Sequence, residues 1–118
     1  MASKAYEIVD VRTNTLVASA VEEATGRWQS FRGLMFRKEL EQSRGLLIRP
    51  VRGIHTHFMR FPIDLIFMDE ENRVVKIRPA MQPWRVDPAR AAAVIEVSAG
   101  LADAADVRVG DELQLRPA

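Results

Sequence analysis

Short apolar runs, each closed by turn-forming residues, constrain the fold of this chain most strongly. The runs have the length of β-strands and are too short for ordinary helices. Strands are expected over residues 6–11, 15–18, 45–48, 54–58, 63–68, 73–77, 93–97 and 112–116. One short helix is expected near residues 22–35, where Ala24, Trp28, Phe31 and Met35 recur at helical spacing. This pattern predicts a mainly β (α+β) fold, a small closed or nearly closed barrel or sandwich of about eight short strands.

Short turns predict which of the central strands are neighbours. Strands 54–58, 63–68 and 73–77 should lie side by side, because sequential strands usually pair. Alternation should place Leu65 and Phe67 on one face of their strand, and Ile66 and Met68 on the other. Residues 79–88 contain three prolines and are expected to form an irregular loop.

The size and composition are those of one soluble globular domain. With 118 residues and 47% hydrophobic content the chain can bury its own core, and we expect a single domain over residues 1–118. The chain contains no cysteine, which excludes disulfides and thiolate metal sites. No stretch has the apolar length of a signal peptide or a membrane helix, so that no membrane contact is expected and the cytoplasm is the expected compartment.

Basic residues are concentrated in one part of the chain. The net charge is only +1, yet residues 27–60 contain eight basic and two acidic side chains. We interpret this segment as a solvated face, because charge runs usually mark exposed surfaces. Interleaved aromatic residues permit a contact with protein or RNA, but helical spacing turns those aromatics inwards, which argues against nucleic acid as a partner.

Both histidines lie in one segment, residues 54–69. On a strand, His55 and His57 point to the same side, because side chains alternate with a period of two. Two imidazoles are half of a zinc or copper site, and Asp64 could add a ligand across a turn. The pair lacks a firm third ligand, so that no metal or other cofactor is expected. His55 alone could act as an acid or base, since imidazole titrates near neutral pH.

Arg60 and Asp64 flank Pro62, which extends or turns the backbone between them. The favoured interpretation is a buried ion pair that holds this bend, because buried charges are normally paired. An unpaired Arg60 would instead bind an anion, and Asp64 could cap backbone amides of the turn. Glu96 lies within an apolar run and becomes a site candidate if its side chain is buried.

A binding cleft is expected where residues 55–60 meet residues 81–85. The chain places Trp84 in a proline-rich stretch, although a small domain would normally bury so large an apolar side chain. Prolines would stiffen such a loop for ligand binding. The candidate site residues are His55, His57, Phe58, Arg60, Asp64, Trp84 and Arg85. The alternative is that Trp84 plugs an end of the barrel.

Two main classes of function follow from these candidates. The first is a binding module whose cleft near His55, Arg60 and Trp84 takes a small polar or anionic ligand. The second is an enzyme that uses His55 with Asp64 or Glu96, with or without a metal. Contact with protein or RNA through the basic segment 27–60 ranks third. Hydrogen-bond reach between His55 and a carboxylate inside a pocket would separate the first two classes.

The order and spacing of five blocks resemble a known prokaryotic family. The blocks cover residues 33–37, 45–48, 58–69, 96–100 and 109–113. Together they resemble the uncharacterised family catalogued as domain of unknown function 192, over nearly the whole chain from about Ala24 to Leu115. The resemblance implies a compact, mainly β domain with no established biochemical activity. Many members have a tryptophan where this chain has Phe58, and an asparagine–threonine pair where it has Arg60-Phe61. This departure resembles a subgroup with a histidine at the position of His55.

Overall fold

The computed structural model describes residues 4–24, 43–57 and 59–118 of the chain. The strands in this part are β1 (Ala5–Asp10), β2 (Thr15–Glu23), β3 (Arg44–Ile48), β4 (Val51–His55), β5 (Ile63–Met68), β6 (Val74–Met81), β7 (Val86–Ala91), β8 (Ala93–Ser98) and β9 (Leu113–Pro117). A four-residue helix, α2 (Leu101–Ala104), follows β8. Among the described residues, no helix is long and apolar enough to cross a membrane.

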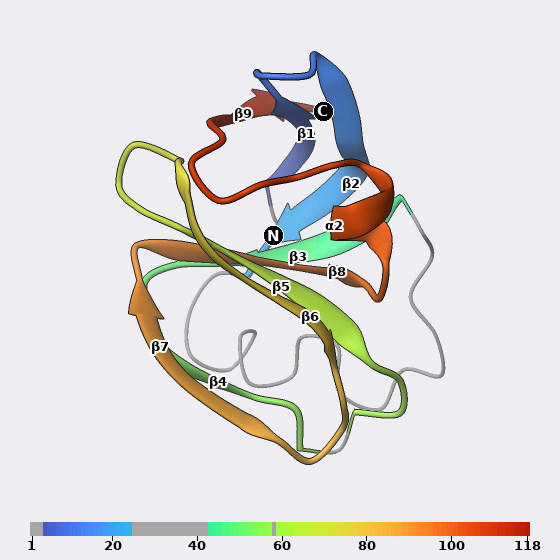
Figure 1. The fold of residues 1–118 in the computed structure, drawn as a ribbon, viewed down its shortest axis with the longest axis vertical. Helices are drawn as coiled ribbons and strands as arrows, with labels where there is room; N and C mark the ends of the chain where they lie inside the picture. The colour runs from blue at the N-terminus through green and yellow to red at the C-terminus, as the bar shows by residue number, and fades with distance from the viewer. Residues whose placement is uncertain (1–3, 25–42, 58) are drawn as a thin grey trace.

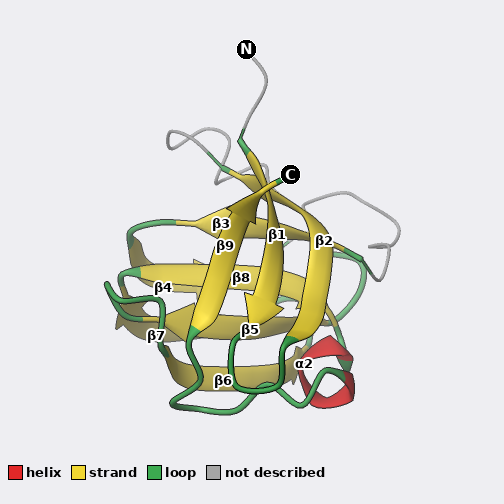
Figure 2. Cartoon of the chain, turned by 90° about the horizontal axis from the view of Figure 1, so that it is seen from above, coloured by secondary structure: helices red, strands yellow, loops and turns green. Residues whose placement is uncertain are grey.

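Seven strands form one curled sheet in the order β6-β5-β8-β3-β2-β1-β9 (Figure 1). All neighbouring pairs are antiparallel except β2 and β3, which run parallel. The two edges of the sheet meet at a bridge between Arg73 and Glu112. A backbone bond of 2.8 Å from the Val74 amide to the Asp111 carbonyl reinforces this contact. The sheet is therefore a nearly closed barrel, and the predicted mainly β fold is confirmed (Figure 2).

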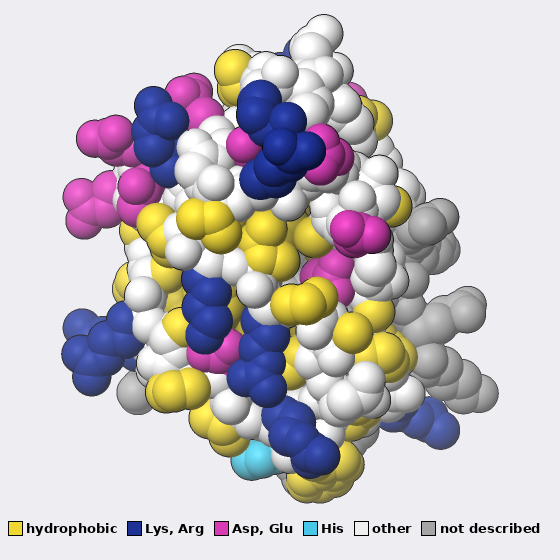
Figure 3. All heavy atoms as spheres, viewed as in Figure 1, with side chains coloured by type: hydrophobic (Ala, Val, Ile, Leu, Met, Phe, Trp, Pro, Cys, Tyr) yellow, Lys and Arg dark blue, Asp and Glu magenta, His cyan; other side chains and the backbone are white. Residues whose placement is uncertain are grey.

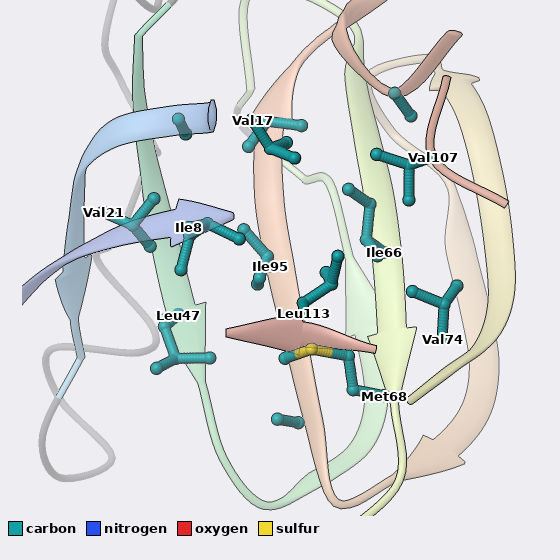
Figure 4. Close-up of a cluster of buried hydrophobic side chains, with 14 residues drawn as sticks. Ile8, Val17, Val21, Leu47, Ile66, Met68, Val74, Ile95, Val107 and Leu113 are labelled. Carbon is teal, nitrogen blue, oxygen red and sulfur yellow. The ribbon is translucent and has the colours of Figure 1, made fainter. Parts of the chain in front are cut away.

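Aliphatic side chains from both halves of the curled sheet fill the barrel (Figure 4). Ile8 and Val21 from one half face Leu47, Ile66 and Ile95 from the other, and all five are almost completely buried. Burial of each such side chain contributes about 1.5–3 kcal/mol. Only one face of β9 points into the barrel, which is why Leu113 and Leu115 alternate with the exposed Gln114 and Arg116.

The strands β4 and β7 form a separate two-stranded ribbon that covers the outer face of the barrel. A second apolar cluster lies between the two layers, with Val51 and Ile54 of β4 packed among Leu65, Phe67 and Val94 of the sheet. The sheet is thus buried on both faces where the ribbon lies over it. This is why β5 and β8 are buried along almost their whole length and are mainly apolar, with Asp64 and Glu96 as exceptions.

The faces of β5 agree with the alternation predicted from the sequence. Leu65 and Phe67 face the ribbon, and Ile66 and Met68 face the barrel interior. The pairing of β5 with β6 is also confirmed. The predicted pairing of β5 with the strand before it is wrong, because that strand is β4, which pairs with β7. The chain between β4 and β5 crosses from the ribbon to the sheet, so that their short connection does not form a hairpin.

Two further expectations need correction. Residues 79–88 are not mainly an irregular loop, since β6 extends to Met81 and β7 begins at Val86, which gives nine strands in the described part of the chain. The helix expected near residues 22–35 cannot begin at Glu22, because Glu22 and Glu23 end β2 and pair with β3. Residues 25–35 lie outside the described residues.

Candidate functional site

A buried threonine joins the two segments in which the sequence predicted a cleft. Thr56 follows β4 and is completely buried. Its hydroxyl donates to the Gln82 carbonyl at 2.7 Å and accepts from the Arg85 amide at 2.9 Å. Its backbone amide donates to the Arg85 carbonyl at 2.9 Å, and its carbonyl accepts from the Trp84 amide at 3.0 Å. Thr56 therefore fixes the conformation of the whole 82–85 turn.

Three aromatic rings form a stack at this junction. The ring centroids of His55 and His57 are 5.1 Å apart, and those of His57 and Trp84 are 5.4 Å apart, each pair tilted by 35°. The two histidines thus lie on the same side, as predicted. Trp84 is 56% exposed, so that the alternative of a plug in the barrel end is wrong. We call these three residues the ring stack.

The backbone of Trp84 adopts a conformation that a bulky side chain normally avoids. Its φ of 63° lies in the left-handed region. Such a conformation costs on the order of 1 kcal/mol and persists only where surrounding bonds hold it. Here the bonds to Thr56 hold it. Thr56 thus fixes the backbone that carries the exposed indole.

A β-bulge decides which side chains of the ribbon point outwards. Gly53 has a φ of 114°, and the pairing register shifts between Arg52 and Ile54. The extra residue lies on β7, where residues 88 and 89 both stand opposite Gly53. On β4 the alternation breaks at Gly53, so that Val51 and Ile54 are buried while Arg52 and His55 are exposed. Without this break, residues three apart on a strand would face opposite sides. The bulge therefore exposes His55 at the ring stack.

Positively charged side chains lie near the ring stack. Partial burial, and secondarily the charge of His57, lower the pKa of His55. Arg60 and Arg85 are both exposed, and the Arg85 guanidinium lies 3.4 Å from the Trp84 carbonyl. A row of Lys and Arg side chains over β6 runs towards an exposed histidine at the lower edge of Figure 3. The surface thus combines exposed ring faces with positive charge.

Asp64 has a structural role away from the ring stack. Its carboxylate accepts bonds from the backbone amides of Ala80, Gly100 and Ala102 at 2.8, 3.1 and 3.0 Å, and it is only 1% exposed. The favoured ion pair with Arg60 is therefore wrong. The alternative, a cap on amides of the turn, is right that Asp64 accepts from backbone amides, but these amides belong to distant segments and not to the turn. These bonds join β5 to the end of β6 and to the start of α2, which leaves Asp64 no role beside His55.

Glu96 is buried, but in the apolar layer beneath the ribbon. It lies on β8 directly between Leu46 of β3 and Leu65 of β5. Burial raises the pKa of its carboxyl to about 7. No hydrogen bond or ion pair from the described residues reaches it, so the proposed pairing with His55 is not formed. Among these same residues, no group of three or more His, Asp or Glu side chains is placed to hold a metal ion.

The described part of the basic segment is partly neutralised. Arg44 lies 3.6 Å from Glu22, and Arg49 binds Glu23. Arg52 and Arg60 are exposed without an ion pair to any described residue. Four basic residues of the segment, and Phe58 of the predicted cleft, lie outside the described residues.

Sequence reasoning predicted a cleft where residues 55–60 meet residues 81–85, and the described residues show an exposed ring stack there. It missed Thr56, the residue that organises this junction. The one available signal was a small polar residue between two histidines at the end of an apolar strand. That signal does not identify partners that lie 26 and 29 residues away. It also did not show that Trp84 would stand on the surface. A groove lined by described residues lies at the other end of the ribbon.

Comparison with known proteins gives a family and a fold. Residues 8–115 match the model of the family DUF192, described as an uncharacterised ACR family. A UPF0127 protein of Thermococcus sibiricus is 33% identical over 92 residues, which are 73% of this chain and 59% of the relative. A UPF0127 protein of Pyrococcus furiosus is 36% identical over 89 residues, 71% of this chain and 76% of the relative. The chain thus spans less than two thirds of the Thermococcus protein.

Two solved structures share the fold. A Sinorhizobium meliloti protein, provisionally described as a transcription regulator, superimposes with a TM-score of 0.83 at 21% identity and covers 98% of this chain and 96% of its own. A Novosphingobium aromaticivorans protein of unknown function superimposes with a TM-score of 0.78 at 23% identity, over 93% and 83% of the two chains. At these identities the likeness concerns the fold alone.

Proposed function

Since the chain belongs to the uncharacterised DUF192 family, we propose its function from its own geometry: it is a binding protein, and the ring stack is its ligand surface. The carrying observation is that Trp84 is held in a left-handed conformation, with its indole exposed, by the bonds to buried Thr56. A fold gains no stability from exposing an indole on a strained backbone. Such an arrangement is useful when it presents a ring to a partner.

The chemistry of the surface indicates a small anion that carries a flat ring. A flat ring can stack on Trp84 or His57, with ring faces offset or tilted as the side chains themselves are. The anionic group can bind Arg85 or Arg60, whose guanidinium groups match carboxylates and phosphates. A fixed surface loses little conformational entropy on binding, which favours affinity.

Calorimetric titration with adenosine monophosphate, adenosine and inorganic phosphate tests the proposal. The nucleotide carries both groups, so that it should bind more tightly than either part. Trp84→Ala should weaken its binding by about tenfold, the typical contribution of one aromatic stacking contact. Arg85→Ala should weaken binding of the nucleotide and leave binding of adenosine unchanged.

Leu16→Ala is the matched control, because Leu16 is similarly exposed on β2 and takes no part in the ring stack. It should leave all three titrations unchanged. Equal affinity for the nucleotide and for phosphate, or an unchanged affinity in Trp84→Ala, would overturn the proposal.

A further inference from the structure

A groove of about 520 Å³ lies at the end of the ribbon opposite the ring stack. It is bounded by the β3–β4 turn, the β5–β6 turn and the β7–β8 turn. Its apolar floor includes Pro50, Val51 and Val75, and Val75 is 48% exposed. In Figure 3, acidic side chains gather over the β5–β6 turn, and basic side chains project near the end of β7.

One wall of the groove carries two arginines that lie directly opposite each other. Arg52 of β4 and Arg90 of β7 are cross-strand partners, and both are exposed and line the groove. Directly opposed like charges destabilise a strand pair. Neither guanidinium forms an ion pair or hydrogen bond with any described residue. The pair therefore concentrates positive charge that no described residue neutralises through an ion pair.

The other wall carries two acidic residues, Asp69 and Glu70. One oxygen of Asp69 accepts the amides of Glu71 and Arg73 at 2.8 and 3.0 Å, which fixes the turn. Glu70 is exposed and makes no ion pair within the described part of the chain. No ion pair joins either of these acids to Arg52 or Arg90 across the groove. Opposite charges thus face each other across an apolar floor without meeting.

We propose that this groove binds a small zwitterion with an apolar body, such as a free apolar amino acid. The carboxylate would lie between Arg52 and Arg90, where it relieves the repulsion of the like charges. The ammonium group would lie against Glu70, and the apolar side chain would cover Val75. Simple anions or cations would meet only one favourable wall. The groove and the ring stack are separate sites, so this inference does not depend on the proposed function.

Calorimetric titration with L-leucine, 4-methylpentanoate and isopentylamine tests each charge in turn. The two analogues retain the apolar body and lack the ammonium or the carboxylate. Leucine should bind at least about tenfold more tightly than either analogue. Arg90→Ala should weaken binding of leucine and 4-methylpentanoate but not of isopentylamine. Glu70→Gln should weaken binding of leucine and isopentylamine but not of 4-methylpentanoate.

Two controls separate this site from the rest of the surface. Arg116→Ala removes an exposed arginine of β9 that pairs weakly with Glu7, and Trp84→Ala disrupts the ring stack. Neither should change leucine binding. The inference is overturned if leucine shows no saturable binding up to about 10 mM, a limit that corresponds to a very weak complex. Equal affinities for the three compounds would overturn it as well.

Discussion

Thr56 shows how one buried side chain can organise a surface site. Its hydroxyl binds the Gln82 carbonyl and the Arg85 amide of the 82–85 turn, and Thr56 itself is completely buried. Thr56→Val keeps the shape of the side chain but removes the hydroxyl that binds the Gln82 carbonyl and the Arg85 amide. We expect a loss of about 2–3 kcal/mol in the free energy of unfolding, measured by urea denaturation.

Thr15→Val is the matched control for Thr56→Val. The Thr15 hydroxyl makes a single 3.3 Å bond to the Thr13 carbonyl and is only partly buried. Its loss should cost well under about 1 kcal/mol. If the two variants are equally stable, Thr56 does not hold the turn in the way described.

Asp64 gives a second test at the scale of a single residue. Asp64→Asn replaces one acceptor oxygen by an amide donor, which would face the backbone amide of Ala80 or those of Gly100 and Ala102. We expect a loss of about 2–4 kcal/mol, measured by thermal or urea unfolding. A cost below about 0.5 kcal/mol would contradict the capping role. Sequence reasoning considered only a cap on amides of the local turn. It could not identify the actual partners, because two of the amides lie 36 and 38 residues away.

The ribbon of β4 and β7 depends on the bulge at Gly53. Gly53→Ala forces an L side chain into a φ of 114°, which should cost about 1–3 kcal/mol or remove the bulge. Because the bulge sets the outward direction of Arg52 and His55, the variant should also weaken binding at both proposed sites.

Gly110→Ala distinguishes these two effects of Gly53→Ala. Gly110 has a similar φ of 98°, and an added Cβ would meet no atom within 4 Å. Gly110→Ala should lower the melting temperature without changing the affinity for leucine or for the nucleotide. Equal binding losses in the two glycine variants would show that the bulge has no special role.

The strands illustrate how far the sequence determines this fold. β5 could be predicted to the residue, because a continuous apolar run ends in the polar turn that begins at Asp69. The extent of β6 and the existence of β7 could not be predicted, since Pro79 and Pro88 normally argue against a strand. Both are tolerated because β6 is the edge of the sheet and β7 belongs to a two-stranded ribbon. The separation of β4 from β5 depends on long-range pairing with β7, to which local patterns give no access.

For the molecule as a whole, buried carboxyl groups predict an unusual pH dependence. Burial raises the pKa of Glu96 from 4.5 to about 7, and burial together with the Asp111 carboxyl raises that of Asp10. A raised pKa means that the folded state holds the proton more tightly than the unfolded state. The stabilisation is therefore complete below about pH 4.5 and is lost as the pH rises through about 7.

Thermal unfolding at pH 5 and pH 8 checks this sign. The melting temperature should be higher at pH 5. Glu96→Gln should reduce the difference in the free energy of unfolding between pH 5 and pH 8 by about 2–3 kcal/mol. Glu112→Gln, an exposed control on the rim of the barrel, should leave the profile unchanged. The lowered pKa of His55 acts in the opposite direction, since it makes the folded state more stable as the pH rises. This effect should be small because His55 is largely exposed. A wild-type protein that is more stable at pH 8 would contradict the assignment.

The exposed ring stack is the central claim for the whole molecule, and the indole N–H signal of Trp84 tests it most directly. The chain has two tryptophans, so that Trp84→Phe identifies which of the two signals in a ¹H–¹⁵N spectrum belongs to Trp84. Titration with adenosine monophosphate should shift the Trp84 signal in a saturable manner, with a much smaller shift for inorganic phosphate. A Trp84 signal that stays in place while the signal of Trp28 moves, or while neither moves, would contradict the account.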